Sequence, residues 1–153
     1  MKISELDLQG RYIEFLNSLN FITLYPPQAD CVSSGLLKNQ NLLVSTPTAS
    51  GKTLVAIIAT LKHIEHGGKI VYLSPLRALA SEKYFDFKKL EKITKSDGSS
   101  IKVSISTGDY ESNSDHLKDS DIIILTNEKF DSLRRHGIKW LSKISLIVID
   151  EIH

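Results

Sequence analysis

Five short apolar runs, separated by stretches with helical periodicity, constrain the fold of this chain more than any other feature. The runs span residues 42–44, 70–73, 101–105, 122–125 and 146–149. Four of them are near-continuous Val, Ile and Leu, which is typical of parallel strands covered on both faces. The third run alternates apolar and polar residues, so we expect that strand to be more exposed and nearer to an edge of the sheet.

Amphipathic stretches before and between the runs predict the helices. Residues 52–66 carry apolar side chains over a wide arc, and Gly67 supplies the left-handed residue that often ends a helix. Further helical patterns cover residues 9–19, 27–37, 76–93 and 127–136. This order predicts an α/β fold with a mostly parallel sheet and helices on both faces. Because no linker or repeat interrupts it, we expect residues 1–153 to form one domain.

The composition is that of an ordinary globular protein, with 41% apolar and 24% charged residues. No apolar run reaches the ~20 residues of a membrane span, and the first ten residues lack the apolar segment of a signal peptide. Cys31 is the only cysteine, so no internal disulfide is possible. These features predict a cytoplasmic protein with no membrane partner. The net charge of +1 gives no sign of nucleic-acid binding, so any phosphate contact must come from local features.

A polar group that in most cases contains glycine or proline follows each apolar run. The groups are TPTASGKT at 46–53, SPLR at 74–77, TGDY at 107–110, TNEK at 126–129 and DEIH at 150–153. Ligands of open parallel sheets bind along the edge where the strands have their carboxyl ends. We therefore expect these five groups to converge on one rim of the sheet.

The first of these groups predicts a phosphate-binding loop, because it ends a strand and opens a helix. Lys52 would bridge the β- and γ-phosphates of ATP, and the Thr53 hydroxyl would ligate Mg²⁺. Backbone N–H groups and the helix dipole would attract the phosphates. The first glycine of the common pattern is replaced by threonine, and a Ser/Thr-rich turn before an ordinary helix is the alternative. The predicted ATP-binding residues of the loop are Thr46, Pro47, Thr48, Ala49, Ser50, Gly51, Lys52 and Thr53.

Asp150 and Glu151 directly follow the last apolar run and predict the acidic half of the same site. Mg²⁺ takes hard oxygen ligands and keeps several waters, so Asp150 would hold the ion. Glu151 could orient and deprotonate the attacking water, which makes Lys52, Asp150 and Glu151 the candidate catalytic residues. On their own, two acids after a strand more often form a solvated turn. The prediction therefore requires the loop and the acids to gather around one magnesium-bound triphosphate.

Five motifs resemble, in order, those of superfamily 2 helicases of the DEAD/DEAH kind. They are LYPPQ at 24–28, the loop at 46–53, SPLRALA at 74–80, TGDY at 107–110 and DEIH at 150–153. The combination is most similar to the archaeal fork-repair DNA helicases called Hjm, in the Ski-like branch, which are related to the helicase half of eukaryotic polymerase theta. Thr46 is normal in that family. The resemblance implies a RecA-like ATP-binding lobe of an enzyme that uses ATP and Mg²⁺ to translocate on single-stranded DNA and unwind duplexes.

The resemblance also implies roles for residues outside the loop and the acidic pair. Gln28 would hydrogen-bond the adenine, with a glutamine that caps the helix starting near Pro27 as the alternative. His153 would couple the ATP site to a later motif. Arg77, Thr107 and Thr126 fall where the family contacts the DNA backbone, although a solvated helix charge is an alternative for Arg77. The implied partners are single-stranded or forked DNA and a second RecA-like lobe.

The family's motif III, second lobe and arginine finger have no counterpart within residues 1–153, so we expect the lobe to be incomplete at its C-terminal side. In related ATPases a later strand inserts between the strands of the phosphate loop and the acidic motif. We expect that strand to be missing, and the chain alone to bind ATP weakly without unwinding DNA. The alternatives are an RNA helicase of the same branch, a small P-loop nucleotide kinase and a non-catalytic adaptor. The adaptor would have a degenerate P-loop, and this is disfavoured because the motif residues are intact, namely Lys52, Thr53, Asp150 and Glu151.

Overall fold

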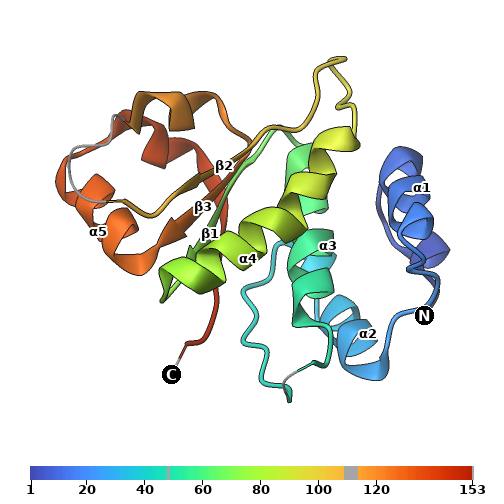
Figure 1. Ribbon diagram of the computed structural model, residues 1–153. Helices are drawn as coiled ribbons and strands as arrows, with labels where there is room; N and C mark the ends of the chain where they lie inside the picture. Colours follow the sequence, from blue (N-terminus) through green and yellow to red (C-terminus); the bar gives the residue numbers. More distant parts are fainter. Residues whose placement is uncertain (48, 109–113, 153) are drawn as a thin grey trace. The chain divides into compact units, whose positions relative to one another are not determined.

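A computed structural model describes residues 1–47, 49–108 and 114–152 (Figure 1). The chain divides into two compact units, Met1–Glu65 and His66–His153. Among the described residues, no helix has both the length and the apolar composition needed to cross a membrane.

The first unit is built from helices. They are the 3-10 helix η1 (Ile3–Glu5), α1 (Gly10–Ser18), α2 (Pro26–Ser33), the 3-10 helix η2 (Leu36–Lys38) and α3 (Lys52–Glu65). The last turn of α3 is tied to the N-terminal segment, since Lys62 forms a 3.1 Å ion pair with Asp7 and Glu65 accepts the backbone N–H of Gln9. Gly67 follows α3 with φ +71°, as predicted for the residue that stops this helix.

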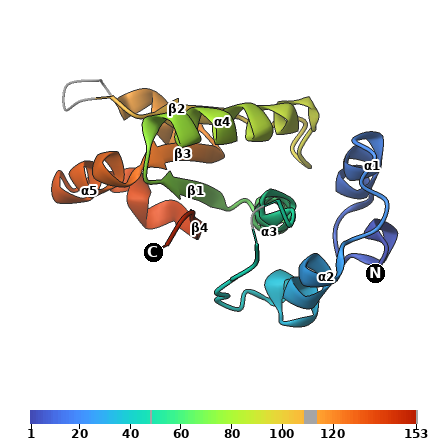
Figure 2. The ribbon, with the colours of Figure 1, turned by 60° about the horizontal axis from the view of Figure 1, so that its bottom comes forward.

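The second unit is a parallel four-stranded sheet with the order β2-β3-β1-β4 (Figure 2). Its strands are β1 (Lys69–Ser74), β2 (Val103–Ser106), β3 (Ile122–Thr126) and β4 (Ile144–Ile149). Its helices are α4 (Arg77–Lys88) and α5 (Asn127–Arg135), with the 3-10 helices η3 (Lys89–Lys92), η4 (Ser114–Asp119) and η5 (Lys139–Lys143). This architecture confirms the α/β fold class and the predicted edge position of the strand near residues 101–105.

Both faces of the central strands are covered. Successive residues of a strand point to opposite sides, so each strand contributes side chains to two packed layers. On one face, Val71, Leu73, Ile123 and Leu125 form a buried cluster with side chains of η4, α5 and η5, namely Leu117, Leu133 and Trp140. On the other face, the ring of Tyr72 packs against Phe87 of α4, and Figure 2 shows α4 along that side of the sheet. The strands β1 and β3 are buried throughout, as their continuous apolar runs predicted.

The strand predicted at residues 42–44 is wrong, because residues 40–47 have no regular secondary structure. Leu43 is 81% exposed. A strand is stabilised by hydrogen bonds to a neighbour, and in the described part of the first unit no strand lies beside this segment. The side chains of this apolar run suit a β-strand, but within the described ranges the segment has no neighbouring strand with which to form backbone hydrogen bonds.

The prediction that residues 146–149 form a strand covered on both faces is also wrong. The strand exists as β4, but the exposure of its residues alternates, and Ile147 and Ile149 are 43% and 49% exposed. The reason is its place in the sheet: among the described strands, β4 pairs only with β1 and forms an edge.

Candidate functional site

The segment between η2 and α3 carries the predicted phosphate loop. Ala49 and Gly51 both adopt left-handed conformations, with φ of 64° and 80°. Left-handed residues in such a loop turn successive N–H groups toward one concave side. The helix α3 begins immediately afterwards at Lys52, so the backbone N–H groups of its first turn lie next to this segment. Thr48, which was predicted to belong to this loop, lies outside the described residues.

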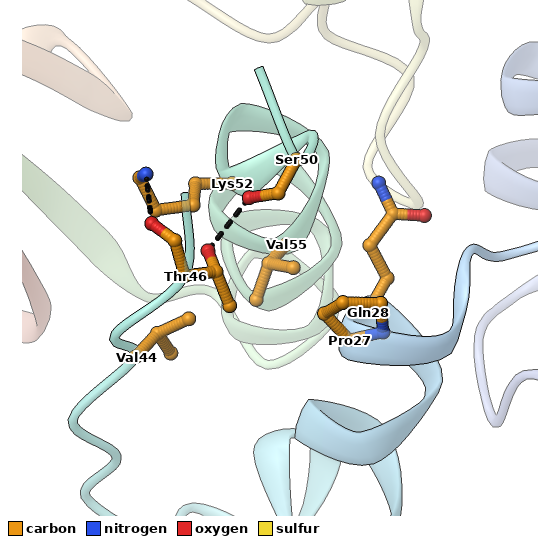
Figure 3. A pocket seen from close by; sticks show the side chains of 7 residues that line it. All are labelled: Pro27, Gln28, Val44, Thr46, Ser50, Lys52 and Val55. Atoms are coloured by element: carbon orange, nitrogen blue, oxygen red, sulfur yellow. Dashed lines mark hydrogen bonds between the residues drawn. The ribbon is translucent and has the colours of Figure 1, made fainter. Parts of the chain in front are cut away.

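Side chains of the loop form hydrogen bonds within the loop and stabilise its conformation. The Lys52 ammonium donates hydrogen bonds to the backbone carbonyls of Thr46 at 2.9 Å and Pro47 at 3.2 Å. The hydroxyls of Thr46 and Ser50 are hydrogen-bonded at 2.6 Å (Figure 3). The Lys52 ammonium is therefore held within the loop by backbone carbonyls, and its contact with a phosphate chain stays a prediction.

Gln28 connects the start of α2 to this loop. Its Oε1 accepts the backbone N–H of Tyr25 at 2.8 Å, and its Nε2 donates to the carbonyl of Gly51 at 3.1 Å. The side chain is 3% exposed. The structure thus shows the helix-capping contact that was the alternative for Gln28, together with a contact to the loop. The hydrogen bond to adenine stays a prediction.

A pocket at this point gathers four of the predicted ATP-binding residues, Gln28, Thr46, Ser50 and Lys52 (Figure 3). Its apolar lining comes from Pro27, Val44 and Val55. Pro47, Ala49, Gly51 and Thr53 belong to the same loop and to the first turn of α3.

In the second unit, the carboxylate of Asp150 is fixed at the end of β4. Its backbone N–H donates to the carbonyl of Leu73 at 3.0 Å and so continues the strand pairing by one residue. Oδ2 accepts the hydroxyl of Tyr72 at 2.8 Å, and Oδ1 accepts the backbone N–H of Glu151 at 3.1 Å. Glu151 itself has a left-handed φ of 51° and is exposed, so the chain turns sharply away from the strand direction there.

Sequence reasoning missed Tyr72 as part of this arrangement, because it lies inside an apolar run. Burial, the hydrogen bond to Asp150 and the negative charge of that carboxylate all raise the pKa of Tyr72. The hydroxyl therefore stays protonated and acts as a donor. The available signal was the residue type, since a tyrosine in a fully buried strand needs a partner for its hydroxyl.

The three predicted DNA-contacting residues follow the carboxyl ends of β1, β2 and β3, on the same edge of the parallel sheet as Asp150. Arg77 is exposed at the start of α4, and Thr107 is partly buried after β2. Thr126 caps α5, where its hydroxyl accepts the N–H of Lys129 at 3.3 Å. Within the second unit, these strand ends do converge on one rim. Asp109, Tyr110 and the coupling residue His153 lie outside the described residues.

The two halves of the predicted site belong to different units of the chain. Lys52 and Thr53 lie in the first unit, and Asp150 and Glu151 lie in the second. The roles of both halves and their convergence on one triphosphate stay predictions.

Similarity to known proteins extends along the whole chain. It is 50% identical over 154 aligned residues to ATP-dependent DNA helicase Hel308 of Methanocella arvoryzae, and 49% identical to Hel308 of Pyrococcus abyssi. These alignments cover all of this chain and 20% and 21% of the two relatives, so the chain spans about a fifth of their length.

The fold has a solved counterpart in a hypothetical ATP-dependent RNA helicase from Sulfolobus tokodaii, with a TM-score of 0.74. That similarity covers 93% of this chain and 41% of the other, and at 19% identity it speaks for the fold alone. The family model described as DEAD/DEAH box helicase matches residues 25–153, which include Gln28, the predicted phosphate loop and the acidic pair. The chain belongs to the DEAD/DEAH box helicase family.

Proposed function

We propose that this chain is the ATP-binding lobe of an ATP-dependent DNA helicase, which hydrolyses ATP to translocate on single-stranded DNA and to unwind duplexes. The proposal is supported by the loop that contains Lys52 and by the hydrogen-bonded carboxylate of Asp150. They occur in a chain that is 50% identical in sequence to a Hel308 DNA helicase over the full length of this chain. Membership of the helicase family supports nucleotide binding. A DNA substrate is inferred from the names of the relatives, and it in turn implies an intracellular, cytoplasmic location.

The residues present fit a magnesium-bound nucleotide. Mg²⁺ in such sites uses one or two protein oxygens, the phosphates and several waters. A cluster of acids is therefore not required, and among the described residues no group of three or more His, Cys, Asp or Glu side chains could hold a metal. Thr53 at the start of α3 and Asp150 after β4 would hold the ion. When bound, Mg²⁺ would neutralise charge on the β- and γ-phosphates.

The side chains of the loop would exchange their present partners for the nucleotide. Lys52 now donates to the carbonyls of Thr46 and Pro47, and it would turn from them to the phosphates without leaving the loop. The N–H groups of the loop and of the first turn of α3 would donate hydrogen bonds to the phosphate oxygens. Gln28 would reach the adenine by giving up its bond to the Gly51 carbonyl.

The two acids would divide the work of hydrolysis. Asp150 has both carboxylate oxygens hydrogen-bonded and is suited to hold a ligand in one orientation. Glu151 is exposed one residue later and would accept the proton of the attacking water. Positioning and charge neutralisation supply most of the rate in phosphoryl transfer.

Arg77, Thr107 and Thr126 would contact the phosphates of a single DNA strand along the rim of the sheet. Contacts of this kind are independent of base sequence and weaken as the salt concentration rises. A second RecA-like lobe would face the same rim and complete the ATP site.

The test is ATP hydrolysis by the intact protein with and without single-stranded DNA, followed by strand separation on a forked duplex. We expect DNA to stimulate hydrolysis and ATP to drive unwinding. Lys52→Ala and Glu151→Gln should abolish both activities while the protein still unfolds at the wild-type temperature. Stimulation by RNA and not by DNA would contradict the assigned substrate. Transfer of phosphate to a nucleotide acceptor, with no response to nucleic acid, would contradict the helicase proposal.

A further inference from the structure

Tyr72 is a buried polar residue that contacts the acidic motif and has no role in the helicase motifs. It lies in the central strand β1, and its hydroxyl donates a 2.8 Å hydrogen bond to Oδ2 of Asp150, 78 positions further along the chain. The side chain is 3% exposed. A buried hydroxyl requires a hydrogen-bond partner, and for Tyr72 that partner is the carboxylate at the rim of the proposed site.

The carboxylate of Asp150 is held on both of its oxygens. Tyr72 contacts Oδ2 from the interior of the sheet, and the backbone N–H of Glu151 contacts Oδ1 at 3.1 Å from the following turn. The final torsion of an aspartate side chain is soft, so one hydrogen bond alone would leave the carboxylate plane to rotate. Two bonds to different oxygens fix the plane. A carboxylate has about four lone-pair positions, so two remain for a metal ion or its waters.

Tyr72 is itself held in place by packing. Its ring lies against Phe87 of α4, with centroids 5.4 Å apart and planes tilted by 60°. Phe87 is fully buried, and β1 is hydrogen-bonded to β3 on one side and to β4 on the other. The position of the hydroxyl is therefore set by the helix and the sheet together, and not by a flexible loop.

We propose that Tyr72 is a positioning residue for Asp150, whose hydroxyl sets the orientation in which that carboxylate receives the magnesium ion of the nucleotide. The inference rests on the proposed function, and it adds a residue that acts through Asp150 without touching nucleotide or metal. Hydrogen-bond partners of metal ligands typically change metal affinity by about 10–100-fold. For one neutral donor we expect the lower end of that range, about tenfold.

The experiment measures binding of a fluorescent, non-hydrolysable ATP analogue to the intact protein, once with MgCl₂ and once with EDTA. Tyr72→Phe keeps the ring and removes only the hydroxyl. We expect its dissociation constant in MgCl₂ to rise about tenfold and that in EDTA to stay at the wild-type value. Tyr84→Phe is the matched control, because it makes the same chemical change on α4, where Tyr84 packs against Phe85 and Lys88. Both of its constants should stay at the wild-type value.

Two further variants separate positioning from a loss of stability. Ile124→Val trims the residue that lies beside Tyr72 in the sheet register, so it lowers the unfolding temperature with the hydroxyl in place. It should leave the magnesium-dependent part of the affinity intact. In an Asp150→Ala background, Tyr72→Phe should have no further effect on magnesium-dependent binding, because the group through which it acts is gone.

Three results would overturn the proposal for Tyr72. They are an unchanged magnesium-dependent affinity in Tyr72→Phe, an equal loss in Ile124→Val at a matched unfolding temperature, and a full additional loss in the Asp150→Ala background. A wild-type protein that binds the analogue equally well with MgCl₂ and with EDTA would overturn the proposed magnesium site as well. The proposed function and the role of Tyr72 therefore fail in distinguishable ways.

Discussion

At the scale of single residues, the contact between Gly51 and Gln28 shows how little space the phosphate loop leaves. Gly51 has φ +80°, and a Cβ added there would lie 2.2 Å from Nε2 of Gln28. The same amide nitrogen donates to the Gly51 carbonyl at 3.1 Å. Glycine is required at this position both by the backbone angle and by the neighbouring side chain.

Gly51→Ala is therefore expected to destabilise the first unit by about 1–3 kcal/mol, through strain at a positive φ and displacement of Gln28. Nucleotide affinity should fall with it, because the loop loses its conformation. Chemical denaturation and analogue binding would measure the two effects. Adding Gln28→Ala should relieve the clash but not the backbone strain, so the double variant should recover only part of the stability. Full recovery would show that the backbone angle does not matter.

Glu91 carries a pH dependence that can be measured in the same way. Partial burial works to raise its pKa, but the N–H of Val103 at 3.0 Å and the ammonium of Lys88 at 2.9 Å outweigh burial and lower the pKa from its ordinary value of 4.5. A carboxyl whose pKa is lowered on folding stabilises the protein above the unfolded-state pKa, and this contribution is lost as the pH falls through the folded-state pKa.

We expect Glu91→Gln to reduce the free energy of unfolding by about 0.5–1 kcal/mol near neutral pH, since the pair with Lys88 is partly exposed. The difference from wild type should shrink as the pH is lowered below about 4.5. Urea denaturation at pH 7, 5 and 3.5 gives the measurement. A difference that grows toward acid pH would have the wrong sign for this explanation.

At the scale of elements, the apolar runs at residues 42–44 and 146–149 differ from the central strands in their pairing and burial. Residues 40–47 have no strand neighbour in the described part of their unit, and β4 forms an edge with its exposed face carrying Ile147 and Ile149. An edge strand presents unpaired backbone groups, and exposed isoleucines on it favour association with other chains.

Ile147→Lys is expected to reduce self-association of residues 1–153 without a large loss of stability, because Ile147 is 43% exposed. Light scattering during concentration and thermal unfolding would be measured together. Ile123→Lys is the contrasting variant, since Ile123 is fully buried in β3 and a charge there should unfold the sheet. If both lysine variants unfolded alike, β4 would not be an exposed edge.

At the scale of the whole molecule, the predicted ATP site draws on two units that are each compact by themselves. Lys52 and Asp150 are held by local contacts within their own units. If both residues bind the same magnesium-bound triphosphate, their contributions to nucleotide affinity are coupled. Removing one residue should then reduce the effect of removing the other.

That coupling can be tested by a double-mutant cycle. Lys52→Ala and Asp150→Ala should each weaken magnesium-dependent binding of the ATP analogue by the intact protein, and the double variant should be little worse than the stronger single one. Purely additive effects would show that the two residues act on separate sites. In residues 1–153 alone we expect weak ATP binding and no unwinding, because the family resemblance implies an arginine finger worth ~10³–10⁵ in rate from a second lobe.

Much of the fold could be predicted because it depends on local periodicity. Helices over 52–66, 76–93 and 127–136, and strands over 70–73 and 122–125, all appear with shifts of a few residues at their ends. Two predictions about strands failed, at 42–44 and at 146–149, and both concerned neighbours. Apolar content shows that a segment suits a sheet, while pairing and burial depend on what else lies beside it.

By itself, the sequence determined the fold class through its periodicity, and it predicted the phosphate loop and the acidic pair, because each is a short pattern whose chemistry lies in neighbouring residues. Only the tertiary structure decided that Gln28 caps its helix and touches Gly51, and that the hydroxyl of Tyr72 orients toward Asp150. Residues 23 and 78 positions apart meet because helices and strands pack in one particular register. That register is a property of the folded chain as a whole, and no local pattern encodes it.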